Sequence, residues 1–144
     1  MKQIVQKIVA GGVIIKNSKV LIAQRAANEE AYPNLWEVPS GKKEPMEKIE
    51  DTVIREVYEE TGLKTKIINV IDVFNFNIEK TDEIRDVTQV IFLLELNKES
   101  NVKLSTEHQN FAWVTKDELN KYNLSKETKT AIEKAFLYKK LLGN

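Results

Sequence analysis

The run Val90-Ile91-Phe92-Leu93-Leu94 constrains the fold more than any other feature of the sequence. Successive side chains of a β-strand point to opposite faces of the sheet, so five consecutive apolar residues give the strand two apolar faces. Both faces then have to be covered. The run therefore predicts a central strand, with a layer of packed structure on each side of its sheet.

The remaining β-rich runs surround this strand. They occupy residues 4–15, 20–24, 36–38, 66–76 and 111–114, while the central strand lies in the run 86–96. The first two runs flank the polar turn 16–19 and predict a β-hairpin. Gly11 and Gly12 interrupt the first run, and glycine inside a strand indicates a bulge or a close approach by another part of the chain. Loops are expected at 26–35 and 97–109.

Two segments have helical spacing. In residues 47–61 the apolar side chains Ile49, Val53 and Val57 recur every four positions, and Gly62 follows as the expected C-cap. Ser125-Lys126-Glu127-Thr128 opens the second helix, which should extend through Leu142. Its expected buried stripe consists of Ile132, Ala135, Phe136 and Leu142. A helical turn is also expected at 117–119. The element order of strands, helix, strands and helix predicts an α+β or α/β sandwich, in which helices pack on the faces of a mixed sheet.

Composition excludes several classes of protein. A chain of 144 residues suits one domain, residues 1–144, and the absence of cysteine excludes disulfides, thiolate metal sites and a cysteine nucleophile. Lys+Arg and Asp+Glu both number 22, so no net charge draws the protein to nucleic acid or anionic lipid. No apolar run approaches the ~20 residues that a membrane span needs. We expect a cytoplasmic protein without nucleic-acid or membrane partners.

The segment 41–63, GKKEPMEKIEDTVIREVYEETGL, carries the candidate chemistry. Glu56, Glu59 and Glu60 occupy positions i, i+3 and i+4, which share an arc of about 100° on a helix. Like charges this close repel, and a hard divalent cation such as Mg²⁺ would remove the penalty. Arg55 can hold one of the carboxylates through a two-pronged hydrogen bond. For the glutamates alone, a solvated acidic helix face is the simpler interpretation.

The spacing of the glycines and of the arginine favours the catalytic interpretation. The segment matches the pattern G-x5-E-x7-R-E-U-x-E-E-x-G-U, in which U is apolar, at every fixed position. The matching residues are Gly41, Glu47, Arg55, Glu56, Val57, Glu59, Glu60, Gly62 and Leu63. This pattern is the Nudix box, with Glu47, Glu56, Glu59 and Glu60 as its glutamates, and the sequence thereby resembles the Nudix hydrolases. This resemblance implies the Nudix fold, an α/β/α sandwich with a mixed β-sheet in the α+β class, over essentially the whole chain.

The resemblance also implies roles for individual residues. Glu56 and Glu60 would be the principal ligands of Mg²⁺, or of Mn²⁺ in its place, with Glu59 completing the carboxylate set. The backbone carbonyl of Ser40 often joins the metal shell in the family. Arg55 would orient the glutamates, and Glu47 would support the loop or an additional metal. Gly41 would allow the loop before the helix to turn tightly.

Outside the pattern, the chain is similar to the MutT-like subgroup. Arg25, in Gln24-Arg25-Ala26-Ala27, matches a position that contacts substrate there, and Trp36 could stack on a base or pack in the core. Glu107 occupies a loop position at which some relatives carry a general base or an extra metal ligand. We favour Glu107 over His108, the only histidine, since a loop histidine is more often a surface residue.

Two positions depart from the family pattern. Ser40 and Met46 stand where the family usually has glycine. Neither change affects the charged residues, so we expect activity to be retained. Ser40 would be strained only if its backbone needed a positive φ.

The resemblance implies hydrolysis of a nucleoside diphosphate linked to another group. The leading expectation is cleavage of a nucleoside triphosphate into the monophosphate and pyrophosphate. One alternative is hydrolysis of a sugar-linked or dinucleoside-linked diphosphate, and another is a nucleotide sensor that does not hydrolyse its ligand. The expected partner is a small nucleotide, and a homodimer is possible.

Overall fold

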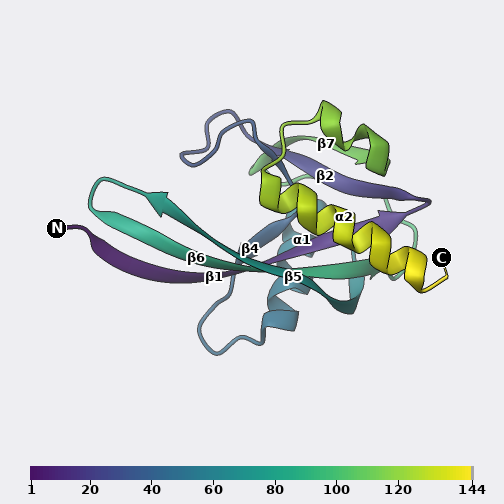
Figure 1. Ribbon diagram of the computed structural model, residues 1–144, viewed down its shortest axis with the longest axis horizontal. Coiled ribbons are helices and arrows are strands. Elements are labelled where there is room, and N and C mark those ends of the chain that lie inside the picture. Colours follow the sequence, from purple (N-terminus) through teal and green to yellow (C-terminus); the bar gives the residue numbers. More distant parts are fainter. Residues whose placement is uncertain (144) are drawn as a thin grey trace.

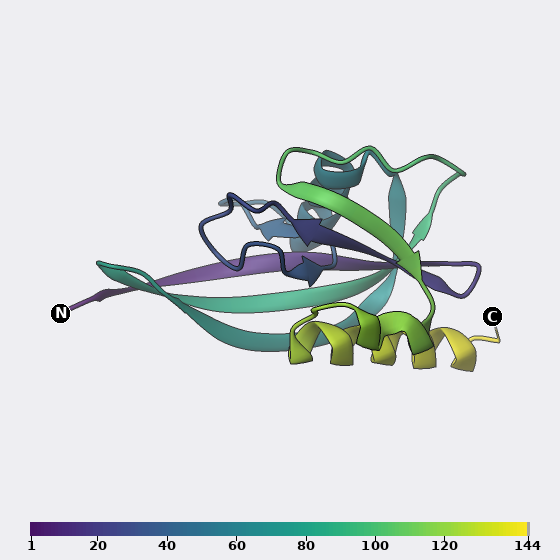
Figure 2. The ribbon, with the colours of Figure 1, turned by 90° about the horizontal axis from the view of Figure 1, so that it is seen from above.

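The computed structural model describes residues 1–143 and shows a curled mixed sheet with one helix on each face (Figures 1 and 2). The strands are β1 (Gln3–Lys16), β2 (Lys19–Arg25), β3 (Trp36–Glu37), β4 (Ser40–Lys42), β5 (Thr65–Glu79), β6 (Glu83–Leu96) and β7 (His108–Val114). The helices are α1 (Ile49–Thr61), the 3-10 helix η1 (Lys116–Lys121) and α2 (Lys126–Leu141). None of the helices in this part of the chain is both long and apolar enough to span a bilayer.

The central strand predicted from the apolar run is β6. It pairs in parallel with β1, from Gln3↔Glu83 to Ile14↔Leu94, and antiparallel with β5 on its other side. The sheet continues from β1 to β2 and β3, in the order β3-β2-β1-β6-β5, with β4 beside β1 and β7 beside β2. The parallel β1–β6 pair next to antiparallel neighbours makes the sheet mixed, as expected.

Each face of the sheet has its own apolar core. On one face, Val53 and Val57 of α1 pack with Phe92 and Leu94 of β6, and all four are at most 2% exposed. On the opposite face, Ile132 and Ala135 of α2 share a cluster with residues of β1, β2 and β6. The two helices therefore complete the expected sandwich, which Figure 2 shows from the side of the sheet.

The close approach predicted at the two adjacent glycines is confirmed. A Cβ atom on Gly12 would lie 2.5 Å from Cδ1 of Leu94, and one on Gly11 would lie 2.9 Å from Cδ1 of Ile91. Both distances are far below ordinary van der Waals contact. Glycine is therefore required here so that β1 can pass between neighbouring side chains.

Three details differ from the predicted elements. The short strand β4 is not signalled in the sequence, because its three residues have no periodicity and it forms only by pairing with β1. Leu142 is 48% exposed and follows the end of α2, so its place in the buried stripe is wrong. Strand β7 begins at His108, where a loop was expected, because residues 108–114 pair with β2.

The two departures from the family pattern have different backbone conformations. Ser40 lies in β4 and does not have a positive φ, so serine is accommodated there without strain. Met46 has φ 69°, in the left-handed region that favours glycine, and it is 98% exposed. The methionine side chain therefore makes no packing contact that could offset the strain of its backbone.

We predict that Met46→Gly stabilises the protein. The left-handed conformation costs an L-residue about 1–2 kcal/mol, and glycine avoids this cost. Glycine also lowers the free energy of unfolding by about 0.4–1 kcal/mol, because it makes the unfolded chain more flexible. The net gain should be about 0.5–1 kcal/mol, which raises Tm by about 2 °C in a domain of this size. Met46→Ala, which keeps Cβ and therefore the strain, is the matched control. Equal Tm values for the two variants in thermal unfolding would contradict the assignment of strain.

Candidate active site

Helix α1 presents its glutamates because its apolar residues fix its rotation on the sheet. Val53 and Val57 are fully buried, which places Glu56 and Glu60 along the adjoining side of the helix. The helix ends at Gly62, which has φ 74° and donates its backbone N–H to the carbonyl of Tyr58 at 2.8 Å. This is the C-cap expected from the sequence. The helical segment 49–61 thus forms a rigid support for the carboxylates.

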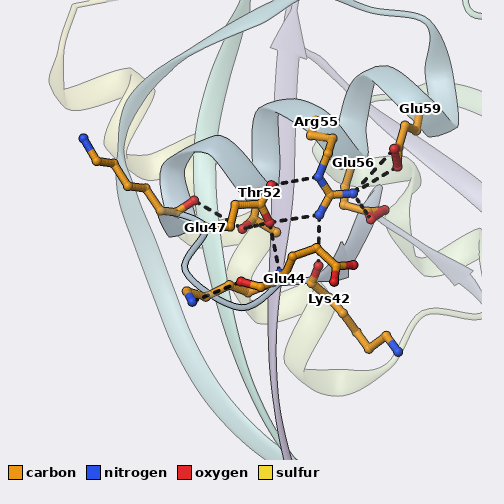
Figure 3. Close-up of polar contacts among 9 residues, drawn as sticks. Lys42, Glu44, Glu47, Thr52, Arg55, Glu56 and Glu59 are labelled. Carbon is orange, nitrogen blue, oxygen red and sulfur yellow. Dashed lines mark hydrogen bonds and ion pairs between the residues drawn. The ribbon is translucent and has the colours of Figure 1, made fainter.

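Arg55 lies at the centre of the polar network that joins α1 to the preceding loop (Figure 3). Its Nε and Nη2 donate to the two oxygens of Glu47, at 2.8 and 3.0 Å. Nη1 donates to Oε1 of Glu56 at 2.8 Å and to Oε1 of Glu59 at 3.1 Å. Nη2 also donates to the carbonyl of Lys42 at 3.1 Å. One guanidinium therefore fixes three carboxylates and the end of strand β4.

Glu47 is held from several directions. Besides the two bonds from Arg55, its Oε1 accepts hydrogen bonds from Oγ1 of Thr52 at 2.8 Å and from the backbone N–H of Glu44 at 3.0 Å. The Arg55 hydrogen bonds are the main cause that lowers the pKa of Glu47 to about 2. Both carboxylate oxygens are thus engaged. Of the two roles considered for Glu47, these contacts favour support of the loop over ligation of an additional metal.

The role expected for Gly41 needs correction. Gly41 lies in strand β4 and does not have a positive φ, so it is not required for a tight turn. A Cβ atom at this position would lie 2.1 Å from both Cδ and Oε2 of Glu56. The residue must be glycine because the Glu56 carboxylate occupies the space of a side chain.

Glu60 is buried, with an exposed fraction of 1%. Its Oε1 accepts a hydrogen bond from the backbone N–H of Ser40 at 3.1 Å, while its Oε2 has no partner within residues 1–143. Burial is the main cause that raises the pKa of Glu60 well above its usual range, and the nearby carboxylates of Glu107, Glu37 and Glu56 raise it further. A buried carboxylate oxygen without a partner is costly unless a cation or a proton satisfies it.

Glu56 borders a cleft of about 370 Å³, whereas Glu47, Glu59 and Glu60 are not among its lining residues. Strands β1, β5 and β6 form its floor, and β4 and α1 contribute Gly41 and Glu56 to its wall. Its lining residues are Lys7, Val9, Arg25, Ala31, Tyr32, Glu37, Ser40, Gly41, Lys42, Glu44, Glu56, Phe76, Ile78, Arg85, Val87, Gln89 and Glu107. Arg25 and Glu107, which lie 82 positions apart in the sequence, thus border the same cavity.

Arg25 and Glu107 also line this cleft. Nε of Arg25 donates to the carbonyl of Ala31 at 2.9 Å, and Nη1 lies 3.3 Å from Oε2 of Glu37. The pKa of Glu107 is raised, first by partial burial and then by the charge of Glu56. Glu107 therefore stands close enough to the box carboxylates to sense their charge, as a residue acting at the same site must.

Trp36 and Glu59, like the buried Glu60, do not line the cleft. The ring of Trp36 packs edge-on against Tyr122, with the ring centroids 4.9 Å apart, and contributes to the core on the α2 face. Of the two roles considered for Trp36, these contacts favour packing in the core over stacking on a base. The Glu59 side chain is 53% exposed, bonds to Arg55 and does not line the cavity, so this geometry gives it no direct contact with a bound substrate.

His108 and Glu37 form a pair that the sequence does not reveal. The His108 side chain is 1% exposed, which corrects its expected surface position, and its Nε2 lies 2.8 Å from Oε2 of Glu37. The same carboxylate oxygen contacts Arg25, so Glu37 joins two strands at the rim of the cleft. These partners lie 71 residues apart in the sequence, and no local pattern signals their contact.

The site fits a hard divalent cation that also contacts the substrate. Within the described part of the chain, no three acidic, histidine or cysteine side chains are arranged as a ready-made ligand set. The unpartnered Oε2 of Glu60 and the neighbouring Glu56 nevertheless provide oxygen donors at one point. Mg²⁺ is characteristically bound through one or two carboxylates plus substrate phosphates rather than by an all-protein cage. The donor set therefore suits Mg²⁺.

Comparisons with known proteins agree with this geometry. The model of the NUDIX domain family matches residues 6–135. "Nucleoside triphosphatase NudI" of Enterobacter sp. (strain 638) is 28% identical over 132 residues, which are 86% of this chain and 92% of that protein. The crystal structure of the MutT protein from Methanosarcina mazei Go1 superposes with a TM-score of 0.79 at 26% identity, covering 96% of this chain and 97% of the other.

A structure with a different substrate in its name has the same fold. The C. elegans Ap4A hydrolase superposes with a TM-score of 0.73 at 24% identity, covering 94% of this chain and 99% of that one. The family model covers nearly the whole chain, including every residue of the carboxylate-bearing helix. The chain belongs to the NUDIX domain family and is a Nudix hydrolase.

Proposed function

We propose that the protein is a Mg²⁺-dependent pyrophosphohydrolase that converts a nucleoside triphosphate into the nucleoside monophosphate and pyrophosphate. The observation that carries the proposal is the buried Glu60 carboxylate, whose Oε2 has no partner within residues 1–143. Its Oε1 accepts a hydrogen bond from the backbone N–H of Ser40, which lines the cleft together with Arg25 and Glu107. A cleft lined by the Glu56 carboxylate and by the guanidinium of Arg25 suits a polyphosphate bridged to the protein by a cation.

Each site residue has a distinct role in this proposal. Glu56, Glu60 and the Ser40 carbonyl would hold the cation, with Glu59 and Mn²⁺ as further family expectations. When bound, the cation would offset the charge that develops on the phosphoryl oxygens. Arg55 keeps Glu56 in position and Glu47 keeps Arg55 in position. Arg25 would bind phosphate oxygens.

Glu107 would act as the general base. Its raised pKa brings it closer to the operating pH, which favours a group that must accept a proton from water. The oxygen of that water forms a bond to the β phosphorus, and the bond from this phosphorus to the α–β bridging oxygen breaks. The nucleoside monophosphate then leaves with the bridging oxygen, and the proton passes to Glu107.

The name of the NudI relative, a nucleoside triphosphatase, supports a triphosphate substrate. Hydrolysis of a dinucleoside-linked diphosphate is the second candidate, since the Ap4A hydrolase shares this fold. A sugar-linked diphosphate is a third. A nucleotide sensor without hydrolysis is less well supported, because all the box glutamates are present.

Product identity in ¹⁸O-water tests the proposal directly. A panel of nucleoside triphosphates, sugar nucleotides and dinucleoside polyphosphates with Mg²⁺ should yield monophosphate plus pyrophosphate from the triphosphates. The label should appear in the pyrophosphate if the β phosphorus is attacked, and in the monophosphate if the α phosphorus is attacked. Nucleoside diphosphate plus orthophosphate as first products would contradict the proposal. Turnover of the linked diphosphates alone would establish an alternative.

We predict that Glu60→Gln abolishes most turnover but leaves the fold intact. Glutamine preserves the volume of the side chain and removes a buried charge that burial and neighbouring carboxylates disfavour. Without Mg²⁺, Tm should therefore stay the same or rise. Mg²⁺ should raise the Tm of the wild type but not that of the variant, because only the native carboxylate binds it. Near-full kcat at saturating Mg²⁺ would show that Glu60 is not a metal ligand.

We predict that Arg55→Lys lowers kcat by about tenfold or more with little change in KM. Lysine keeps the positive charge but has no planar fork, so it cannot contact Glu47 twice while also holding Glu56. The measurement is steady-state kinetics with the best substrate of the panel. Arg85→Lys, which changes a cleft arginine outside this network, is the control. An unchanged kcat would reduce Arg55 to a surface ion pair.

A further inference from the structure

Strand β5 forms an open edge of the sheet. One side of β5 pairs with β6, and no other strand within residues 1–143 pairs with its other side. The hairpin of β5 and β6 extends well beyond both helices, so its far end stands clear of α1 and α2 (Figures 1 and 2). An open edge presents a row of unpaired backbone N–H and C=O groups, to which another strand can bind.

The half of β5 that packs on α2 is protected against such pairing. Its register with β6 shifts twice, between Ile67 and Asn69 and between Val70 and Asp72. The side chains of Asn69 and Asp72 accept hydrogen bonds from the backbone N–H groups of Val70 and Val73, at 2.8 and 2.9 Å. Bulges and charged side chains are features with which folded proteins prevent edge-to-edge association.

The other half of β5, residues 73–79, lacks this protection. It pairs with β6 without a register shift and contains neither proline nor lysine. The N–H of Lys80 donates to the carbonyl of Glu83 on β6 at 2.8 Å. Because alternate residues of an antiparallel strand bond to the partner strand, every second residue before Lys80 directs its backbone groups to the open edge. These outward-facing residues, all of them exposed, are Val73, Asn75, Asn77 and Glu79.

This edge is complementary to a second copy of itself. In an antiparallel pair with Phe76 opposite Phe76, Asn75 lies opposite Asn77, and Val73 lies opposite Glu79. Each outward-facing residue of one copy then exchanges backbone hydrogen bonds with an outward-facing residue of the other. Any other register leaves some of the four without a partner of this kind.

The side chains agree with the same register. Phe76 and Ile78 share the face of β5 that lines the cleft, and Phe74 lies on this face by the alternation of the strand. Phe74 of one copy faces Ile78 of the other on both sides of the Phe76 pair, and such apolar cross-strand pairs stabilise a sheet. At each end, Asp72 of one copy faces Lys80 of the other. The register therefore opposes unlike charges and brings no like charges together.

We propose that residues 73–79 of β5 pair edge to edge with the same residues of a second copy. The product is a two-fold symmetric dimer in which the sheet continues from one chain into the other. Asp72 and Lys80 also bond within their own chain, to Lys134 and Glu30, and these bonds hold the charges at the two ends of the edge. The dimer requires neither the cation nor the nucleotide, so it goes beyond the proposed function.

Proline at position 77 tests the proposed pairing. Asn77 lies opposite Asp86 and directs its N–H away from β6, so Asn77→Pro removes a donor that the chain itself does not use. In sedimentation equilibrium at about 100 µM, where a dimer with a Kd of ~10 µM is mostly assembled, the wild type should have twice the mass of one chain. Asn77→Pro should have the mass of one chain.

Asn77→Ala is the matched control, because it removes the same side chain and keeps the backbone N–H. It should remain a dimer. A wild type that is monomeric at this concentration would overturn the inference, and so would a dimer that persists in Asn77→Pro.

Cross-linking tests the register without the proline. The chain contains no cysteine, so each introduced thiol is unique. Asn75→Cys mixed with Asn77→Cys should form disulfide-linked dimers under mild oxidation, since opposed residues of this kind lie about 5.5 Å apart at Cα. Each variant alone should cross-link several-fold more slowly, because its thiols are offset along the strands.

Met46→Cys, on the exposed loop before α1, measures cross-linking by random collision. A mixture of the two β5 variants that cross-links no faster than Met46→Cys would overturn the inference, even if Asn77→Pro fails to fold. Faster cross-linking of Asn75→Cys alone than of the mixture would overturn the proposed register.

Discussion

The bidentate ion pair between Arg55 and Glu47 underlies the geometry of the whole catalytic wall. It closes the loop between β4 and α1 onto the helix, at 2.8 and 3.0 Å, and the same guanidinium reaches the carbonyl of Lys42 at the end of β4. Strand β4 has only three residues, so its position depends on such contacts as much as on its pairing with β1. Because Gly41 of this strand lies against the Glu56 carboxylate, the loop and the helix set the position of that carboxylate together.

The site concentrates negative charge that a folded protein would otherwise avoid. Glu60 is buried beside Glu37, Glu56 and Glu107, and its pKa rises as a result. Arg55 contacts Glu56 and Arg25 contacts Glu37, and both guanidinium groups also donate to other groups. Such an arrangement is unfavourable for stability alone. In the proposed function, a bound cation and the phosphates of the substrate would satisfy the carboxylates that the protein leaves without a positive partner.

The long parallel pairing of β1 with β6 positions residues of the cleft. It extends without interruption from Gln3↔Glu83 to Ile14↔Leu94, and both strands contribute lining residues to the cleft. Gln89 pairs with Val9 in this register, and a slip of one residue would turn its amide toward α1 instead. The same register that builds the apolar core therefore decides which side chains of β6 face the cleft.

The sequence by itself determined the central strand, both long helices, the mixed sandwich and the set of box residues. These features depend on local periodicity or on fixed spacings within about two dozen residues. Residues at helical spacings lie next to each other once the helix forms. It also determined that Glu56, Glu59 and Glu60 share one arc of α1, although not that Glu60 is buried while Glu59 is half exposed.

Only the tertiary structure decided the burial of His108 against Glu37, the packing of Trp36 on Tyr122, the steric need for glycine at position 41 and the place of Gln89 in the lining of the cleft. Each of these depends on a partner from another element, reached by chain folding rather than by sequence spacing. A polar residue such as Gln89 in an apolar strand is a signal in the sequence, but its meaning depends on which face is hollow. That is decided by how the sheet curls and where β4, α2 and the 26–35 loop close over it, because these set which side chains are left uncovered.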